Sequence, residues 1–532
     1  MTRKQLPTAV ERRGSVLLVV LVIIVLLALG AYTFTEMSVA ENEATTMYGR
    51  SVLARAFAES GIDVAANSLA DPAQHQQVDP VLNRPDLFSA VLLRIADVAR
   101  GRGRFSVISG QPQDQTGMAL RFGLSDESGK LNLNTILLWA TNNKLTDDTT
   151  RACLMQLPNM TNDVADAILD WIDSDDNPRQ YGAEAEYYLA LPQPYRPANG
   201  FLTSLDDLLL VRGVTPALLY GEDLNRNGIM DPGEDLNGDG YFDRGWSAYL
   251  TIYSAERNVQ LDGTLRVNVN QQNLPQLYQQ LQGLMGDTVA QFVVAYRMNG
   301  PQSATSGRGG GSGSGRTSTS SSSASSGSTV QLGGMSVPTA PATSHTVTSL
   351  YQFIGKTVTV TINGSKKNLQ CPWANSVSSM SQYLPDLLDK LTLVDDSFIH
   401  GRINVNQAPF EVLMGVPNMS EVLARQIVAA QSLGAASSAS GSSQSPRATT
   451  AWLIVEGLVS LTGTPTMAQL DPYLTSHGAV YRAQSIGYFD EGGPFVRLEA
   501  VIDGSIDPPR ILNFRDLSDL GRGFSRQQLG VP

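Results

Sequence analysis

The stretch DLNRNGIMDPGE, residues 223–234, places acidic and amide side chains at the spacing of a calcium-binding loop. In EF-hand-type loops alternate side chains turn toward the ion, a glycine at position 6 makes the sharp bend, and a glutamate at position 12 supplies two oxygens. The sequence therefore predicts a calcium site, the alternative being a solvated acidic turn. The expected ligands are the side chains of Asp223, Asn225, Asn227, Asp231 and Glu234 and the carbonyl of Ile229, with Gly228 at the bend.

A second stretch of the same kind, DLNGDGYFD at residues 235–243, follows at once. It has Trp246 where the loop glutamate is expected, so this site must borrow a ligand or bind weakly. A third, weaker candidate begins at Asp173 and has Pro178 at the glycine position. The expected ligands are Asp235, Asn237, Asp239, Tyr241 and Asp243 in the second loop, and Asp173, Asp175, Asn177 and Glu184 in the third candidate.

No other group of residues suggests chemistry, so we expect no enzyme. Asp170 and its acidic neighbours could be paired carboxylates, but a calcium site or a helix-end cluster explains them more simply, and a membrane-tethered hydrolase ranks last. The four histidines are scattered. Cys153 and Cys371 allow one disulfide at most, or two buried thiols. The formal net charge of −12 disfavours nucleic acid as a partner.

The chain opens with a basic segment, a glycine and an apolar run, ERRGSVLLVVLVIIVLLALGAYTF at residues 11–34. The run is longer than the roughly 7–15 apolar residues of a signal peptide and is long enough to span a bilayer as a helix. Lys and Arg mark the cytoplasmic side, so the bulk of the chain is expected outside the cytoplasm. The basic residues before the span are Arg3, Lys4, Arg12 and Arg13, and the acidic residues after it are Glu36, Glu41 and Glu43.

The helix is expected to continue beyond the membrane. From Ser15 to about Leu69 there is no proline, and apolar residues recur at helical spacing. One continuous helix of this length would reach roughly 80 Å at 1.5 Å per residue.

A basic leader ending in glycine before a long, half-apolar helix resembles the type IV pilin and pseudopilin family. The resemblance implies that a prepilin peptidase cuts after Gly14, that Ser15 becomes the methylated N-terminus, and that the helix is kept. Most members carry glutamate at the fifth mature position, where this chain has Val19. A carboxylate in the bilayer needs a partner, expected to be the N-terminal amine of the preceding subunit. Its absence fits the K-type minor pseudopilin at the tip of the type II secretion pseudopilus.

The middle of the chain repeats itself. Asn-x-Asn at residues 132–134, 268–270 and 404–406 precedes apolar-periodic helical segments, and the asparagines suit helix entry because their side-chain oxygens can accept first-turn N–H groups. The first and third copies share PNM at the break between helices, which resembles a helix–hairpin–helix or SAM-like unit. DNA-binding versions need a glycine-rich hairpin and basic residues, and these hairpins have neither, so we expect a structural or protein-contact unit.

Four motifs in order carry the resemblance to the K-type family: SDESGKLNLN, ILDWIDSDD, GAEAEYYLAL and SLDDLLLVRGVTP, between residues 125 and 216. The resemblance implies an α+β fold, with a pilin-like antiparallel sheet and a large inserted helical domain, and members bind calcium. It implies the bacterial inner membrane as location and, as partners, I- and J-type minor pseudopilins and the major pseudopilin. The alternative is a type IV pilus minor pilin.

Strand and linker signals complete the expected organisation. RGRFSVISG near residue 103 should join a sheet with a C-terminal hairpin in residues 479–503, and TVTVTINGSKK near Thr357 reads as a hairpin with an Asn-Gly turn. Ser/Gly-rich stretches at 302–344 and 433–447 read as flexible linkers. The expected segments are a leader (1–14), helix (15–70), first sheet part (71–130), helical domain with calcium loops (131–300), linker (301–345), second SAM-like region (346–480) and C-terminal strands (481–532).

Overall fold

The computed structural model describes most of the chain, although several predicted segments fall partly or wholly outside it. The leader residues 1–12 and much of both serine-rich stretches, 303–327 and 438–446, lie outside the described residues. The described residues are 13–70, 81–111, 114, 117–302, 328–339, 345–437, 447–462 and 464–531.

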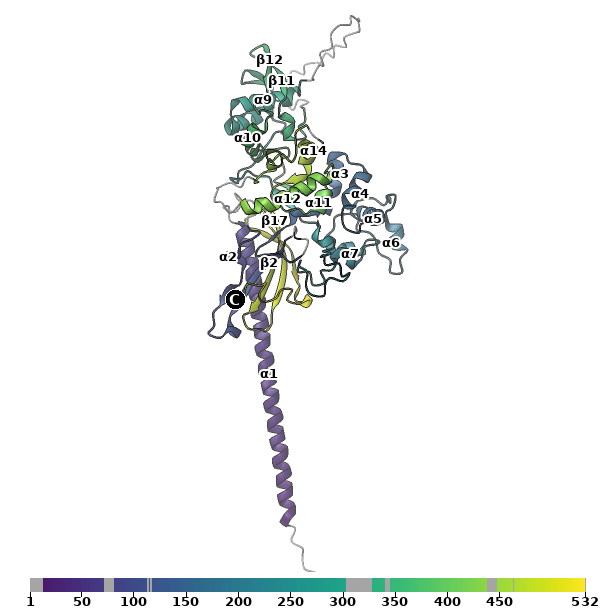
Figure 1. The fold of residues 1–532 in the computed structure, drawn as a ribbon, viewed down its shortest axis with the longest axis vertical. Coiled ribbons are helices and arrows are strands. Elements are labelled where there is room, and N and C mark those ends of the chain that lie inside the picture. Colours follow the sequence, from purple (N-terminus) through teal and green to yellow (C-terminus); the bar gives the residue numbers. More distant parts are fainter. Residues whose placement is uncertain are drawn as a thin grey trace, which may run out of the picture.

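The N-terminal apolar run continues into one unbroken helix, α1 (Arg13–Ala70), which confirms the predicted continuous helix. Its 58 residues correspond to a length of about 87 Å at 1.5 Å per residue. Among the described residues it is the one helix long and apolar enough to cross a membrane, and its side chains from Val16 to Phe34 are largely exposed. Figure 1 shows α1 projecting from the rest of the molecule. The helices α9 (Asp287–Asn299) and α10 (Val377–Lys390) and the hairpin of β11 (Thr357–Ile362) and β12 (Ser365–Gln370) lie at the opposite end.

The second half of α1 packs on an antiparallel sheet built from two distant parts of the chain. The predicted pairing is confirmed: β2 near the N-terminus pairs with β17, which forms a hairpin with β18. The strand order is β1-β2-β17-β18-β19, with β3 beside β2 and β4 beside β17. The bounds are β1 (Val91–Arg94), β2 (Gly103–Gly110), β3 (Leu120–Arg121), β4 (Ser125–Asp126), β17 (Val480–Phe489), β18 (Val496–Asp503) and β19 (Arg510–Asp516).

Glycines bring α1 unusually close to the sheet. A Cβ atom at Gly61 of the helix would lie 2.1 Å from Ser485 Oγ, and one at Gly487 of β17 would lie 2.0 Å from the carbonyl oxygen of Ala54. A side chain at Gly487 would press on the backbone of α1, and one at Gly61 would displace the side chains of Ser485 and Phe105. The buried apolar side chains of this layer include Ala54, Phe57, Ala58, Ile62, Phe105, Val107, Ala483, Leu498, Ala500 and Ile502.

The alternate side chains of the same strands face the other way and meet the inserted helical region and the C-terminal segment. Ile108 of β2 and Ile486 and Tyr488 of β17 form a second apolar cluster with Ile229, Phe524 and Leu529. Because strand side chains alternate in direction, one set of strands holds α1 on one face and the insert on the other.

The insert lies between β4 and β17 and is mainly helical, as expected. It also contains a four-stranded antiparallel sheet, β12-β11-β10-β9, in which β11 and β12 form the predicted hairpin. The sheet bounds are β9 (Thr329–Leu332), β10 (Met335–Pro338), β11 (Thr357–Ile362) and β12 (Ser365–Gln370). The α-helices are α3 (Leu133–Asn143), α4 (Asp147–Leu154), α5 (Asn162–Ile172), α6 (Ala185–Leu189), α7 (Pro216–Tyr220), α8 (Leu274–Met285), α9 (Asp287–Asn299), α10 (Val377–Lys390), α11 (Phe410–Met414), α12 (Glu421–Ser437), α13 (Trp452–Val455) and α14 (Met467–Leu470), and α2 (Pro85–Phe88) precedes β1.

The three Asn-x-Asn copies share one local structure, so the second copy is a repeat in structure as well. In each, the first asparagine's side-chain oxygen accepts the backbone N–H of the second asparagine, at 2.7–3.0 Å. In each, the first asparagine ends a two-residue strand that pairs in parallel with a later Leu-Thr strand. The pairs are β5 (Leu131–Asn132) with β6 (Leu250–Thr251), β8 (Val267–Asn268) with β13 (Leu391–Thr392), and β15 (Ile403–Asn404) with β16 (Leu474–Thr475).

The expected role of these asparagines in helix entry is correct for one copy only. Asn132 is the N-cap of α3, but α8 is capped by Asn273 and α11 begins after Pro409. The other two pairs lie too far before their helices, because three residues separate Asn270 from Leu274 and Asn406 from Phe410. Instead, the second asparagine of each pair donates its amide N–H to a main-chain carbonyl of a distant segment.

Candidate metal sites

The first predicted calcium loop, residues 223–234, follows α7 and is organised around its own carboxylates. Asp223 Oδ1 accepts the N–H of Asn227 at 3.0 Å, and Asp223 Oδ2 accepts the N–H of Gly228 at 2.9 Å. Gly228 has φ +76°, a left-handed conformation that suits glycine, so it makes the bend expected at position 6.

Glu234 closes the same loop from its other end. Its Oε1 accepts the N–H groups of Leu224 and Asn225 at 3.1 and 3.4 Å, and its Oε2 accepts that of Asp231 at 2.9 Å. The amides of Asn225 and Asn227 donate to Asp231 Oδ2 at 2.6 and 2.8 Å. The five predicted side-chain ligands of the first loop are therefore brought together.

Two features of this loop fit a cation. Asn225 Oδ1, at position 3, is buried with no hydrogen-bond partner among the described residues, so it has an unused acceptor. Burial, with a smaller contribution from the charge of Glu234, raises the pKa of Asp223 to about 6. Both the unused oxygen and the cost of burying an ionised carboxylate would be relieved by a bound cation.

The first loop is also fastened to the sheet. Ile229, at position 7, is buried in the cluster beneath β2 and β17. Gln484 of β17 donates to the carbonyl of Arg226 at 2.8 Å, and Arg497 of β18 donates to the carbonyl of Asn225. The loop therefore joins the insert to the sheet.

The second loop, residues 235–246, is more exposed, and a glutamate outside it makes the hydrogen bonds that its missing glutamate would make. Trp246 is buried in the helical core and donates to the carbonyl of Pro158, so position 12 supplies no ligand. Glu222 takes its place: Oε1 accepts the N–H groups of Leu236 and Asn237 at 2.8 and 3.3 Å, and Oε2 accepts that of Asp243 at 3.3 Å. These are positions 2, 3 and 9, the same three that Glu234 serves in the first loop.

Glu222 was missed at the sequence level, although a repeat could have identified it. The segment GEDLN occurs at residues 221–225 and again at 233–237. Glu234 is the last residue of the first loop and directly precedes the second, and Glu222 directly precedes the first. Like Glu234, Glu222 is 6% exposed. The other predicted residues of the second loop, including Asp235, Asp239 and Tyr241, lie in an exposed turn closed by Asp235 Oδ1 and Oδ2.

The third candidate forms a cluster with a membership different from the predicted one. Ligand oxygens of Asp170, Asp173 and Glu184 lie within 4.8 Å of one another. Glu184 is 4% exposed, and neither of its carboxylate oxygens has a hydrogen-bond partner among the described residues. Burial and the nearby charges of Asp170 and Asp173 raise the pKa of Glu184 to about 7. Arg179 Nη1 donates to Asp170 Oδ1 at 2.7 Å and to Asp173 Oδ2 at 2.5 Å, so the unused acceptors of this cluster are the two oxygens of Glu184, and these would suit a cation.

Asp175 and Asn177 lie outside this cluster, and their role as ligands stays a prediction. Asn177 donates both its backbone and its side-chain N–H to Asp175 Oδ1 at 2.8 Å, in an exposed turn. Asp170, for which the sequence left a calcium site or a helix-end cluster open, lies in this cluster. A Cβ at Gly182 would lie 1.7 Å from Asp170 Oδ2, so the glycine of the GAE motif leaves room for this carboxylate.

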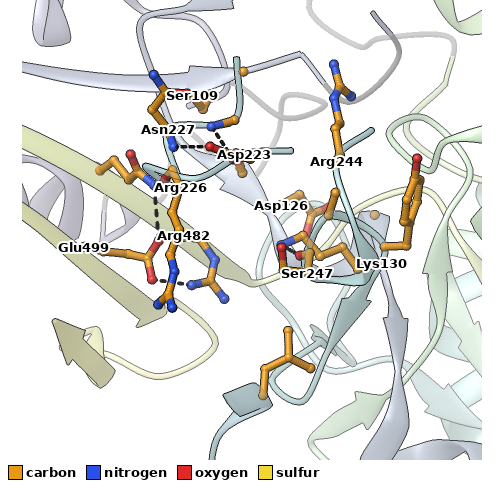
Figure 2. Close-up of a pocket in the computed structure, with 18 of the residues that line it drawn as sticks. Ser109, Asp126, Lys130, Asp223, Arg226, Asn227, Arg244, Ser247, Arg482 and Glu499 are labelled. Carbon is orange, nitrogen blue, oxygen red and sulfur yellow. Dashed lines mark hydrogen bonds and ion pairs between the residues drawn. The ribbon is translucent and has the colours of Figure 1, made fainter. Parts of the chain in front are cut away.

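A cavity of about 190 Å³ separates the first loop from the sheet. Figure 2 shows Asp223, Arg226 and Asn227 of the loop on one side and Arg482 and Glu499 of the sheet on the other. Arg482 Nε lies 2.9 Å from Glu127 Oε1, and its Nη1 lies 2.6 Å from Glu499 Oε1. Burial raises the pKa of Glu127, but the charges of Arg482 and Lys130 outweigh it and lower that pKa to about 2.

The predicted cleavage residues Gly14 and Ser15 lie in the first turn of α1. Cleavage there stays a prediction. Cys153 is buried and Cys371 half-buried, and both are free thiols.

Comparison with known proteins identifies one domain. The family model described as type II secretion system (T2SS), protein K matches residues 129–220. The type II secretion system protein K of Pectobacterium carotovorum subsp. carotovorum is 46% identical over 48 residues, which are 9% of this chain and 15% of that protein. These matches confirm the resemblance to the K-type family over the part of the chain that they cover.

A crystal structure of the GspK-GspI-GspJ complex from the type 2 secretion system of enterotoxigenic Escherichia coli is also similar, over 90% of this chain and 99% of that one. The identity is 11% and the TM-score 0.34. The family-model match includes Asp170, Asp173 and Glu184 and ends before both calcium loops.

Proposed function

We propose that this chain, whose residues 129–220 are a type II secretion system protein K domain, is the K-type minor pseudopilin at the tip of the type II secretion pseudopilus. There it nucleates assembly with I- and J-type minor pseudopilins, ahead of the major pseudopilin, and supports protein export across the outer membrane. The match to the protein K family carries this proposal. The role is structural, with no catalytic step.

The architecture supports a position at a filament end. The insert fills the end of the head opposite α1 (Figure 1), where a further subunit would have to stack. Val19 offers no carboxylate to the N-terminal amine of a preceding subunit. A chain of this design can begin a filament but cannot extend one.

Labelling tests the tip position. Gold-labelled antibody against the insert should mark at most one copy at a filament end. Labelling at regular spacing along the shaft would contradict the proposal. Purification of the tagged full-length chain should recover I- and J-type pseudopilins, whereas recovery of adhesion or twitching components would favour a type IV pilus minor pilin.

The proposed location is the bacterial inner membrane, with the N-terminus cytoplasmic and the bulk periplasmic. Prepilin peptidase would remove residues 1–14 and leave Ser15 as the methylated N-terminus of α1. N-terminal sequencing of membrane-extracted protein should then begin at Ser15. A start near Ala31 would mean an ordinary signal peptidase and would contradict the pseudopilin proposal.

Calcium is the proposed structural ion. The first loop would hold it through Asp223, Asn225, Asn227, Asp231 and Glu234, the second with Glu222 in the place of the missing glutamate, and the third cluster through Asp170, Asp173 and Glu184. The ion supplies positive charge to carboxylates that otherwise repel one another. Periplasmic sites need only weak affinity, about 10⁻⁴ to 10⁻³ M. Melting of the full-length chain in detergent should shift down by several degrees in chelator and recover with calcium more than with magnesium.

A further inference from the structure

One charged side chain of the sheet lies directly against the first calcium loop. Arg497 belongs to β18 and points to the face that carries the insert, where it is 0% exposed. Its Nη2 donates to the carbonyl of Asn225, at loop position 3. Its Nε and Nη1 have no hydrogen-bond partner among the described residues. A guanidinium buried with two unsatisfied nitrogens is costly unless nearby charges compensate for it.

Nearby carboxylates offset part of this cost, although burial outweighs them and lowers the pKa of Arg497. Asp223 and Asp231 act on Arg497 from the loop, and Glu499 acts on it from the same strand. Arg497 in turn is a cation that acts on Asp223. Without a metal ion, Arg497 therefore serves as a countercharge for the carboxylates that are proposed to bind calcium.

The C-terminal segment holds Arg497 in this place. A Cβ at Gly523, where φ is +75°, would lie 2.1 Å from Arg497 Nη1 and 3.2 Å from the Cβ of Asn227. The carbonyl of Gly523 accepts the side-chain N–H of Asn227. The guanidinium is thus enclosed between the sheet, the loop and the C-terminal segment and cannot swing away when an ion enters.

We infer that Arg497 sets the calcium affinity of the first loop, because its enclosed positive charge beside the site opposes the ion and its hydrogen bond to the Asn225 carbonyl holds the ion-free loop on the sheet. This inference rests on the proposed calcium site. Removing Arg497 should tighten calcium binding, since a fixed positive charge beside the site opposes a divalent cation. At an effective dielectric constant of about 20 and a separation of several ångströms, the expected change in affinity is at least about tenfold.

The test compares calcium dissociation constants of the full-length chain in detergent, measured by competition with a chromophoric chelator. The binding event that Glu234→Gln removes is assigned to the first loop. Arg497→Met, which keeps the length but not the charge, should bind calcium about tenfold more tightly there. Arg497→Lys, which keeps the charge, should stay within threefold of the wild type.

Arg226→Asn is the matched control. It removes a cation from the same loop, but the Arg226 side chain lies over the Tyr220 ring, 3.9 Å from its centroid, and Asn tolerates the left-handed backbone at this position. Its dissociation constant should change by less than threefold. If Arg497→Met binds no more tightly than the wild type, or if Arg226→Asn gains as much as Arg497→Met, the inference is wrong.

A second measurement tests the inference even if Arg497→Met is unstable. In chelator, Arg497→Met leaves Asp223 without its countercharge and should melt below the wild type. Asp223→Asn combined with Arg497→Met should recover part of that loss, and no recovery would overturn the inference. A wild-type chain that binds no calcium refutes the site itself and this inference with it, whereas normal binding that ignores Arg497→Met refutes only the role of Arg497.

Discussion

The two predicted calcium loops repeat one motif in adjacent positions, yet they differ in what surrounds them. Position 7 of the first loop is Ile229, which is 1% exposed in the apolar cluster beneath the sheet. Position 7 of the second loop is Tyr241, which is 64% exposed. The first loop contacts β17, β18 and the C-terminal segment, while the second is held through Glu222. Ligand spacing therefore indicates where an ion can bind, and the neighbouring elements decide what the ion can stabilise.

The largest expected effect concerns the ion pairs across the cavity from the first loop. Glu127→Gln would leave Arg482 and Lys130 without their buried carboxylate, so we expect a loss of about 3–5 kcal/mol in the free energy of unfolding. Urea unfolding of the full-length chain measures it. Glu491→Gln in the exposed β17–β18 turn is the control and should change stability by less than about 0.5 kcal/mol.

Lowering the pH should abolish the difference in stability between the wild type and Glu127→Gln. Because the pKa of Glu127 is lowered to about 2 in the folded chain, from a reference value of 4.5, its contribution is present above pH 4.5 and is lost as the pH falls toward 2. The gap in stability between the wild type and Glu127→Gln should therefore shrink from pH 5 to pH 2. A constant gap would mean that the carboxylate charge is not what stabilises this contact.

The matched substitutions at position 7 compare the loops directly. Ile229→Ala and Tyr241→Ala both keep the main-chain carbonyl that would bind the ion. Ile229→Ala should destabilise by about 3 kcal/mol, since it leaves a cavity in a buried cluster, whereas Tyr241→Ala should stay within about 0.5 kcal/mol. Equal losses in thermal unfolding would refute the difference between the loops.

Substitutions of Glu234 and of Glu222 should each affect calcium binding in one loop only. Glu234→Gln should remove the calcium-dependent stabilisation of the first loop, roughly 2.7 kcal/mol at a hundredfold excess over Kd. Glu222→Gln should cost less, about 1 kcal/mol, because the loop that it serves is exposed. Each should reduce the number of ions bound in equilibrium dialysis by one, and Asp243→Asn should weaken binding less than Glu222→Gln. An unchanged number in Glu222→Gln would show that the second loop does not borrow this residue.

Much of this organisation follows from local patterns in the sequence. The continuous α1, the β17–β18 and β11–β12 hairpins and the convergence of the first loop were all predicted, because each depends on residues close together in the chain. β19 was not predicted, since RILNFRD mixes charged and apolar residues on an exposed edge strand. Contacts between distant parts of the chain were not predicted either. Arg497 is about 270 residues from the loop that it contacts, and no rule of local spacing covers such a separation.

The third cluster also contains a residue that the spacing of the sequence did not identify. Asp173 and Glu184 were chosen by loop spacing, but the cluster depends on Asp170, which α5 presents as its buried face turns toward Gly182. Helical geometry, and not loop geometry, selects this carboxylate. Glu222 could have been predicted from the repeated GEDLN segment, because in each copy the glutamate directly precedes the first residue of a loop.

The glycine contacts beneath α1 have a mechanical consequence. Gly487 places the backbone of β17 against the backbone of α1 at Ala54, and Gly61 leaves room for the Ser485 side chain, so a shift of α1 along the sheet would produce a clash at one of these places. We therefore expect α1 and the sheet to move together. A force applied to the membrane end of α1 would then be passed to the sheet, and enlarging Gly61 would loosen that coupling.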